Sequence, residues 1–87
     1  MEVKFHRSFL KLYEKLPAKV QRRFEERLLV FQKDPFDESL HNHPLHGPWA
    51  GFRSINVTGD YRSIYESLDG KVATFYAIGT HSKLYDS

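Results

Sequence analysis

At the start of the chain, polar and apolar residues alternate briefly, and the apolar positions then follow a helical spacing. In residues 1–6, Val3 and Phe5 alternate with polar residues, which predicts a short half-buried strand. Ser8 is of a type that caps helices. The next apolar positions fall at i, i+3, i+4 and i+7: Phe9, Leu12, Tyr13 and Leu16. This spacing predicts an amphipathic helix that ends before Pro17.

A second helical pattern follows Pro17, whose missing N–H suits the first turn of a helix. Its apolar positions share one face: Val20, Phe24, Leu28 and Phe31. The opposite face carries polar side chains: Arg22, Arg23, Glu26 and Lys33. Asp34 and Pro35 end the pattern. Two such helices joined by a tight turn predict an αα-hairpin with a shared apolar side.

Residues 34–48 show no periodicity, and loops of about 15 residues in compact domains are often functional. Three strand-like segments follow at residues 52–58, 61–66 and 71–78. In the first of these, Ser54 and Asn56 fall on the side opposite Ile55. Turn signals separate the segments at Gly59-Asp60 and at Asp69-Gly70.

The order of the elements predicts an α+β fold. We expect an N-terminal strand and a two-helix hairpin packed on one face of a small, mainly antiparallel four-stranded sheet. The length of 87 residues indicates a single domain that spans residues 1–87. The absence of cysteine excludes disulfides and thiolate metal sites. No apolar run approaches the roughly 20 residues of a membrane span, and no signal-peptide pattern is seen, so we expect a cytoplasmic protein.

Charge is distributed unevenly between the two halves. Residues 1–33 carry nine Lys and Arg against four Asp and Glu, whereas residues 34–87 carry four against seven. A basic half suits a polyanion such as RNA or an acidic protein partner. A well-solvated helical surface has the same composition, so charge alone leaves both interpretations open.

Side chains suited to RNA cleavage lie in the second half of the chain: His43, Asp60, Arg62, His81 and Tyr85. Arg53 and Asn56 are secondary candidates. Cleavage needs a group that takes the 2′-OH proton, a group that protonates the leaving 5′ oxygen, and stabilisation of the phosphorane-like transition state. Histidine suits the first two roles, and arginine suits the third. A tyrosine can stack on a base. This chemistry requires no metal and no cofactor.

Each candidate also has a purely structural interpretation. Asp60 follows Gly59 in a turn, where a carboxylate often caps the backbone. Arg62 can be an ordinary surface ion pair, and Tyr85 can pack the end of the chain onto the sheet. The histidines could supply zinc ligands: His41, His43, His46 and His81. Their spacing matches no known zinc signature and no carboxylate is paired with them, so we expect no metal.

Three motifs carry a resemblance to a known family: HPLHGPWAGFR at residues 43–53, GDYRSIY at residues 59–65 and IGTHSKLY at residues 78–85. They resemble the RelE/ParE toxin superfamily, in particular its YafQ branch, with the patterns H-P-L-x-G-x-W-x-G-[FY]-R, D-[WY]-x-x-x-Y and G-[ST]-H-x-x-L-[FY]. The helical half is similar as well, including the K-L-P between its helices. The resemblance implies a ribosome-dependent, metal-independent mRNA endoribonuclease that a cognate antitoxin protein neutralises.

The resemblance also implies roles for individual residues. His43 matches a catalytic histidine, and Asp60 matches an active-site aspartate with Tyr61 as the aromatic beside it. His81 matches the histidine after the last strand, and Tyr85 matches the terminal aromatic that supports the substrate base. Arg62 fits the RelE-like branch, in which an arginine of the G-x-Y-R segment helps to bind the scissile phosphate.

Two positions depart from the YafQ pattern. Asn56 stands where a histidine is expected, and Ala77 stands where an arginine is expected. We hypothesise that Arg62 replaces the missing cation and that His43 and His81 form the acid–base pair.

Partners follow from the same resemblance. The basic helices would contact ribosomal RNA through six side chains: Lys11, Lys15, Lys19, Arg22, Arg23 and Arg27. The antitoxin is expected to be a small, partly acidic protein that orders on binding, and the free toxin is expected to be a monomer. Two alternatives stay open. One is a ParE-like toxin that inhibits DNA gyrase without ribonuclease chemistry, and the other is a decayed toxin that still binds its antitoxin.

Overall fold

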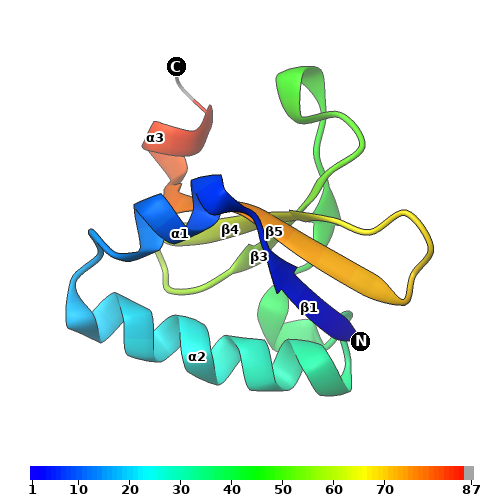
Figure 1. Cartoon of the computed structure of the whole chain (residues 1–87), viewed down its shortest axis with the longest axis horizontal. Coiled ribbons are helices and arrows are strands. Elements are labelled where there is room, and N and C mark those ends of the chain that lie inside the picture. Colours follow the sequence, from blue (N-terminus) through cyan, green and yellow to red (C-terminus); the bar gives the residue numbers. More distant parts are fainter. Residues whose placement is uncertain (86–87) are drawn as a thin grey trace.

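Five strands form one mixed sheet in the order β1-β5-β4-β3-β2 (Figure 1). The computed structural model describes residues 1–85. Its strands are β1 (Glu2–Phe5), β2 (His43–Pro44), β3 (Arg53–Asn56), β4 (Tyr61–Glu66) and β5 (Val72–Thr80). Its helices are α1 (Arg7–Tyr13), α2 (Ala18–Lys33) and α3 (His81–Tyr85), with 3-10 turns at Glu38–Leu40 and Gly47–Trp49. Within these residues no helix is both long enough and apolar enough to cross a membrane.

The α+β class and the two helices packed on a small sheet are confirmed, but the predicted strand number is wrong. β1 runs parallel to β5, and the other neighbouring strands are antiparallel. The fifth strand is β2, which lies in the segment predicted to be irregular and pairs His43 with Ser54 and Pro44 with Arg53. Two residues are too few to show a period of two, so only their pairing with β3 identifies them as a strand.

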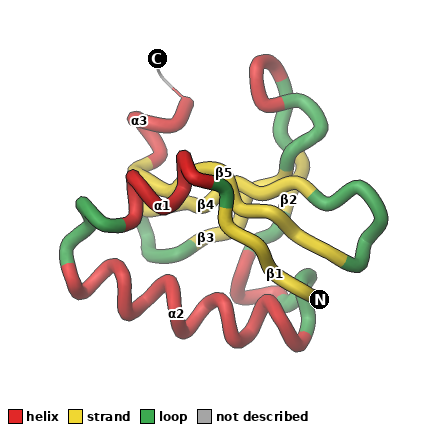
Figure 2. The backbone as a smooth tube through the Cα atoms, in the orientation of Figure 1, coloured by secondary structure: helices red, strands yellow, loops and turns green. Residues whose placement is uncertain are grey.

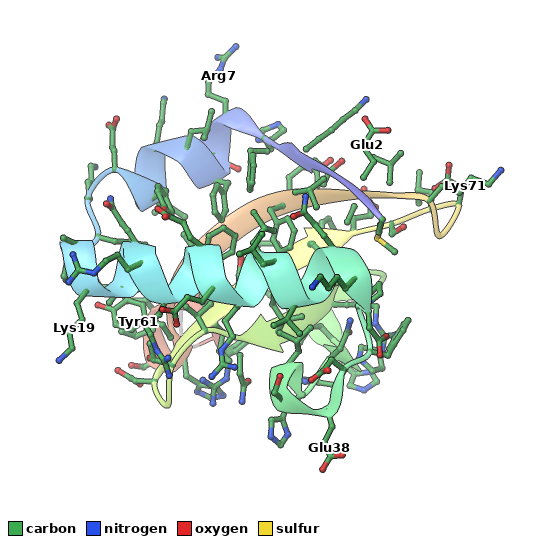
Figure 3. The ribbon with its side chains drawn as sticks, turned by 90° about the horizontal axis from the view of Figure 1, so that it is seen from below. Glu2, Arg7, Lys19, Glu38, Tyr61 and Lys71 are labelled. Atoms are coloured by element: carbon green, nitrogen blue, oxygen red, sulfur yellow. The ribbon has the colours of Figure 1, made fainter. Side chains whose placement is uncertain are left out.

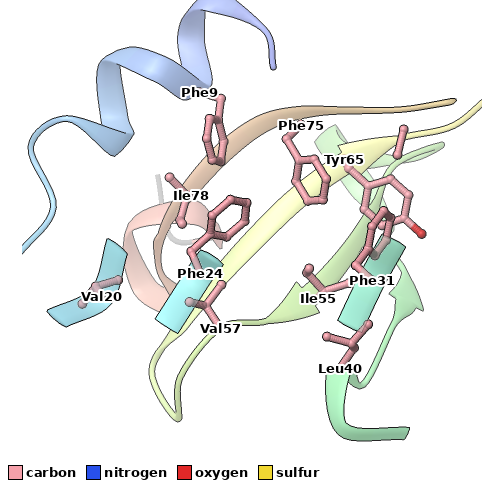
Figure 4. Close-up of a cluster of buried hydrophobic side chains, with 11 residues drawn as sticks. Phe9, Val20, Phe24, Phe31, Leu40, Ile55, Val57, Tyr65, Phe75 and Ile78 are labelled. Atoms are coloured by element: carbon pink, nitrogen blue, oxygen red, sulfur yellow. The ribbon is translucent and has the colours of Figure 1, made fainter. Parts of the chain in front are cut away.

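The core lies between α2 and one face of the sheet, and Phe75 of β5 is at its centre (Figure 4). The Phe75 ring centroid lies 6.0 Å from that of Phe9, 5.7 Å from that of Phe24 and 5.3 Å from that of Phe31. Four of the apolar positions that predicted the helices are therefore buried in this core, namely Phe9, Val20, Phe24 and Phe31, whereas Leu12 is exposed. After β1, α1 continues along the edge of β5 and turns Phe9 into the same core.

The predicted cap of the first helix is wrong. The N-cap is His6, whose Nδ1 accepts the backbone N–H of Ser8 at 3.1 Å. Ser8 itself is inside the helix, and its hydroxyl donates to the backbone oxygen of Tyr76 at 2.7 Å. The His6 ring also stacks on Tyr76 with centroids 4.7 Å apart. An unprotonated imidazole nitrogen accepts a hydrogen bond as a serine oxygen does, and contact with β5 decides which residue is the cap.

The helical hairpin is closed by the side chain of Tyr13. Its hydroxyl lies 3.2 Å from the backbone oxygen of Gln21 and 3.1 Å from Oε2 of Glu25, and the Gln21 amide donates back to the Tyr13 carbonyl at 2.8 Å. Burial, together with the hydrogen bond and negative charge of Glu25, raises the pKa of Tyr13 to about 12.

The loop before β2 is held by Asn42. Its amide nitrogen donates to the Pro35 carbonyl at 2.8 Å and to the Tyr65 hydroxyl at 2.7 Å. Its oxygen accepts from Nε of Arg53 at 2.7 Å. The Arg53 guanidinium also lies 5.1 Å from the centre of the Phe36 ring. The segment predicted to be an irregular loop is therefore tied to β3 and β4 at the residue that precedes His43.

Candidate active site

The sheet face opposite α2 carries most of the residues that the sequence singled out. In the sheet register His43 pairs with Ser54, Ser54 with Ile64, and Ile64 with Ala77. Paired residues of neighbouring strands point to the same face. Ile55 and Tyr65, which alternate with this row, belong to the core on the α2 side. A second row on the open face joins Asn56, Arg62 and Gly79.

The short helix α3 covers part of this open face. In Figure 1, α3 and the loop between β2 and β3 both rise on the side of the sheet away from α2, and Figure 2 shows the same arrangement along the backbone. The backbone N–H of His81 donates to the Asp60 carbonyl at 3.0 Å. The indole N–H of Trp49 donates to the Leu84 carbonyl at 3.2 Å. The Tyr85 hydroxyl donates to Oγ of Ser54 at 3.1 Å.

A depression of about 270 Å³ lies between α3 and β2. Its walls are formed by six residues from two distant segments: His43, Pro44, Leu45, His46, His81 and Tyr85. Two histidines and the tyrosine that the sequence predicted thus line one space, although about 40 residues separate them along the chain. A larger, mostly apolar groove of about 700 Å³ lies on the other side of α3, but its lining includes no histidine and no carboxylate.

The local contacts of His43 decide which of its nitrogens is available. Nδ1 lies 2.8 Å from the backbone oxygen of His41. Because a carbonyl oxygen only accepts, Nδ1 carries the proton, and Nε2 of the neutral ring is the free base. His43 and His81 are both exposed, so solvent and substrate reach them. The His81 ring meets the Tyr85 ring edge to face, with centroids 4.7 Å apart.

Arg62 lies on the same face but outside the depression. Its guanidinium donates to the carbonyls of the β3–β4 turn, at 3.0 Å to Thr58, 3.2 Å to Gly59 and 3.1 Å to its neighbour Tyr61. All three hydrogen bonds are made by Nη1, and they hold the guanidinium beside the turn. Neighbouring Asn56 pairs with Arg62 in the register and is half-buried.

Three other predicted site residues have contacts outside the depression. The backbone carbonyl of Asp60 accepts the His81 N–H at the start of α3, and Asp60 itself is exposed. The Tyr61 side chain packs against the core and lines a hollow with Leu12 and Leu16. Arg53 is held by Asn42 and stands at the other end of β3 from Asn56. Among residues 1–85, no three His, Cys, Asp or Glu side chains lie close enough together to hold a metal ion.

Three residues that shape the site are not predicted by any pattern in the sequence. Ser54 is fully buried, although its alternation with Ile55 placed it on a polar face, because Tyr85 covers it. Trp49 holds α3 through the Leu84 carbonyl, and Asn42 holds the loop before β2 through the Pro35 carbonyl. Trp49 lies within one of the three motifs, but the pattern of a motif does not show what its tryptophan contacts.

Comparison with known proteins places this geometry in a family. A family model described as "Bacterial toxin of type II toxin-antitoxin system, YafQ" matches residues 1–86. The curated mRNA interferase toxin YafQ of Escherichia coli K12 is 36% identical over 58 residues. This match covers 67% of the present chain and spans 62% of the length of that relative.

Solved structures show the same fold. The crystal structure of YafQ from Escherichia coli BL21(DE3) aligns with a TM-score of 0.80 and 22% identity, over 97% of both chains. A crystal structure of the Escherichia coli DinJ-YafQ complex aligns with a TM-score of 0.69 and 25% identity, again over 97% of both chains. The strands, helices and terminal α3 described above are therefore those of a known toxin fold.

Proposed function

Because this chain belongs to the YafQ family of bacterial type II toxin–antitoxin toxins, we propose that it is an mRNA endoribonuclease that acts on the ribosome. The observation that carries the proposal is the depression in which His43 from β2 and His81 from α3 face one space beside Tyr85. Two imidazoles suit RNA cleavage without a metal, since each can take or give a proton near neutral pH.

The proposed reaction uses the two histidines in turn. Nε2 of His43 takes the proton of the 2′-OH, and the 2′ oxygen forms a bond to phosphorus. The bond from phosphorus to the 5′ oxygen breaks, and protonated His81 gives its proton to that oxygen. The products are a 2′,3′-cyclic phosphate and a 5′-hydroxyl end. We assign the base to His43 because its Nδ1 proton is bound to the His41 carbonyl, which leaves the lone pair on Nε2.

Stabilisation of the negative charge on the transition state is assigned to Arg62. Its guanidinium offers paired donors to phosphate oxygens, and its place beside the site lets it replace the cation that Ala77 does not supply. Tyr85 supports a base of the message, while Asp60, Tyr61, Arg53 and Asn56 are proposed to help shape the substrate path. Since Nη1 of Arg62 is bound to turn carbonyls, Nε and Nη2 are the donors that we assign to the phosphate.

The basic surface is the proposed ribosome contact: Lys11, Lys15, Lys19, Arg22, Arg23 and Arg27. Figure 3 shows Lys19 pointing away from the body of the protein. Arg27 differs from the others because its Nε donates to the Val57 carbonyl at 3.3 Å, and Arg23 is paired with Glu26 at 3.1 Å. Replacing Lys19 should therefore reduce the salt dependence of ribosome binding by about one counterion.

Partner and location are part of the proposal. The DinJ-YafQ complex shows that a relative assembles with an antitoxin. We propose that an acidic antitoxin binds this chain as well, and that both proteins are cytoplasmic because the target of this chain is the translating ribosome and the target of the antitoxin is this chain.

The test is cell-free translation with purified protein and mapping of the cuts on the message. Wild type should cleave within the translated region. His43→Ala and His81→Ala should each lower the rate about 100-fold or more, because each removes a proton-transfer group. Ser82→Ala, which changes an exposed neighbour of His81, is the matched control and should cleave as wild type does. Equal cleavage by wild type and His81→Ala would refute the proposed chemistry.

One alternative has specific support. Asn56 and Ala77 stand in place of two expected active-site residues, and Arg62 is bound to its own turn. A folded protein that binds its antitoxin but leaves ribosome-loaded messages intact would be a decayed toxin or a non-enzymatic one. DNA supercoiling by gyrase in the presence of the protein then separates these two outcomes.

A further inference from the structure

The helix that carries His81 depends on contacts with the rest of the protein. α3 has five residues and none of them is buried. One turn of helix is unstable in isolation because nucleation is costly. Among residues 1–85, four hydrogen bonds hold it: His81 N–H to Asp60 and Lys83 N–H to the Thr80 hydroxyl at its start, and Trp49 to Leu84 and Tyr85 to Ser54 at its end. The position of His81 is therefore set by its anchors.

Ser54 is the anchor that joins the two halves of the site. Its side chain is fully buried, and its Oγ accepts the Tyr85 hydroxyl proton. In the register it is the direct partner of His43. The Tyr85 ring in turn packs edge to face on His81. The Ser54 hydroxyl thus links β3, next to His43, to the Tyr85 ring, which packs against His81.

We propose that Ser54 is a positioning residue, which sets the separation of His43 and His81 through the Tyr85 hydroxyl. The inference rests on the proposed function, because it assigns a role to Ser54 in the same RNA-cleaving site. Ser54 touches neither RNA nor the transferred proton. Its contribution is to keep α3 from moving away from β2 when the message enters the depression.

Loss of the anchor should affect turnover more than binding. Ser54→Ala removes one oxygen and adds no atom, so the fold has no clash to relieve. With Tyr85 released, His81 samples several positions, and misplacement by about 1 Å costs on the order of 100-fold in rate. We expect kcat to fall about 10- to 100-fold and KM to change less than about 3-fold. Ser63→Ala is the matched control, since Ser63 is equally buried but its hydroxyl donates to the Ala77 carbonyl and not to α3.

A double-mutant cycle separates positioning from a general structural effect. Tyr85→Phe removes the hydroxyl and keeps the ring, so Ser54→Ala should add almost nothing in that background. If the two losses in kcat multiply instead, the hydrogen bond is not the route and the proposal is overturned. Trp49→Phe, which keeps a ring but deletes the donor to Leu84, should lower kcat in the same direction through the second anchor.

A readout without catalysis keeps this proposal distinct from the proposed function. The ring protons of His81 lie beside the Tyr85 ring and should show a ring-current shift by NMR in the folded protein. That shift should decrease in Ser54→Ala and persist in Ser63→Ala. An unchanged His81 signal in folded Ser54→Ala would overturn the positioning role even where wild type cleaves RNA. A reduced shift combined with an inactive wild type would support the positioning role while refuting the proposed function.

Discussion

Asn42 is the residue at which a small change should have a large structural effect. Its amide satisfies three groups at once: the Pro35 carbonyl, the Tyr65 hydroxyl and Nε of Arg53. Asn42→Ala leaves all three without this partner. The Tyr65 side chain is 1% exposed, so water cannot easily replace the lost bond to its hydroxyl.

The expected loss follows mainly from two of those groups, the Tyr65 hydroxyl and Arg53. A buried hydroxyl without a partner costs about 1–3 kcal/mol, and the partly buried bond to Arg53 adds about 0.5–1.5 kcal/mol. Together they give a loss of roughly 2–4 kcal/mol in the free energy of unfolding. A domain of this length has a total of roughly 4–13 kcal/mol. The melting temperature should therefore fall by on the order of 15 °C.

Urea unfolding followed by the fluorescence of Trp49, the single tryptophan of the chain, measures this loss. Gln32→Ala removes an exposed amide from α2 and should change stability by less than about 0.5 kcal/mol. In a Tyr65→Phe background the penalty of Asn42→Ala should fall to about 1 kcal/mol, since the orphaned hydroxyl is gone. A loss below about 0.5 kcal/mol in the wild-type background, or an equal loss in both backgrounds, would refute the reasoning.

Three further outcomes are expected. Phe75→Ala should cost about 3–5 kcal/mol by denaturant titration, because it empties the centre of the core, whereas Leu68→Ala at a turn residue that is 90% exposed should cost less than about 0.5 kcal/mol. Gly70 has a φ of 74°, so Gly70→Ala should lose about 1 kcal/mol in the same assay, although its Cβ would meet no atom within 4 Å. The raised pKa of Tyr13 means that its protonated form is favoured by folding, so its contribution is complete below pH 10 and is lost as the pH rises through about 12. Stability measured across this range should fall more steeply for wild type than for Tyr13→Phe, and identical slopes would contradict a raised pKa of Tyr13 in the folded protein.

The local elements were predictable because their signals are local. The stripe that contains Phe24 and Phe31 repeats with the period of a helix, and both side chains are buried against the sheet. Gly70 follows an aspartate between two strand-like segments and adopts the positive φ that such a turn needs. The motifs around His43 and His81 indicated the family before any contact was known.

Tertiary pairing decided what those signals do not carry. β2 has two residues, so its identity as a strand comes only from its partners in β3. His6, and not Ser8, is the N-cap of α1, and the Ser8 hydroxyl instead donates to the Tyr76 carbonyl of β5. Arg62 has the residue type and the strand position expected of a phosphate-binding arginine. The carbonyls of the β3–β4 turn nevertheless hold its side chain outside the depression.

The sequence by itself therefore determined the segments of α1 and α2 and of four strands, but not β2 or α3, together with which faces are apolar and which side chains could move a proton. It did so because these properties depend on residue type and on spacing within about one turn of helix or two strand positions. Only the folded chain decided that Tyr85 of α3 reaches Ser54 of β3, that Ser54 is buried and that His43 and His81 line one space. Those contacts join residues about 30–40 positions apart, and no local period records them.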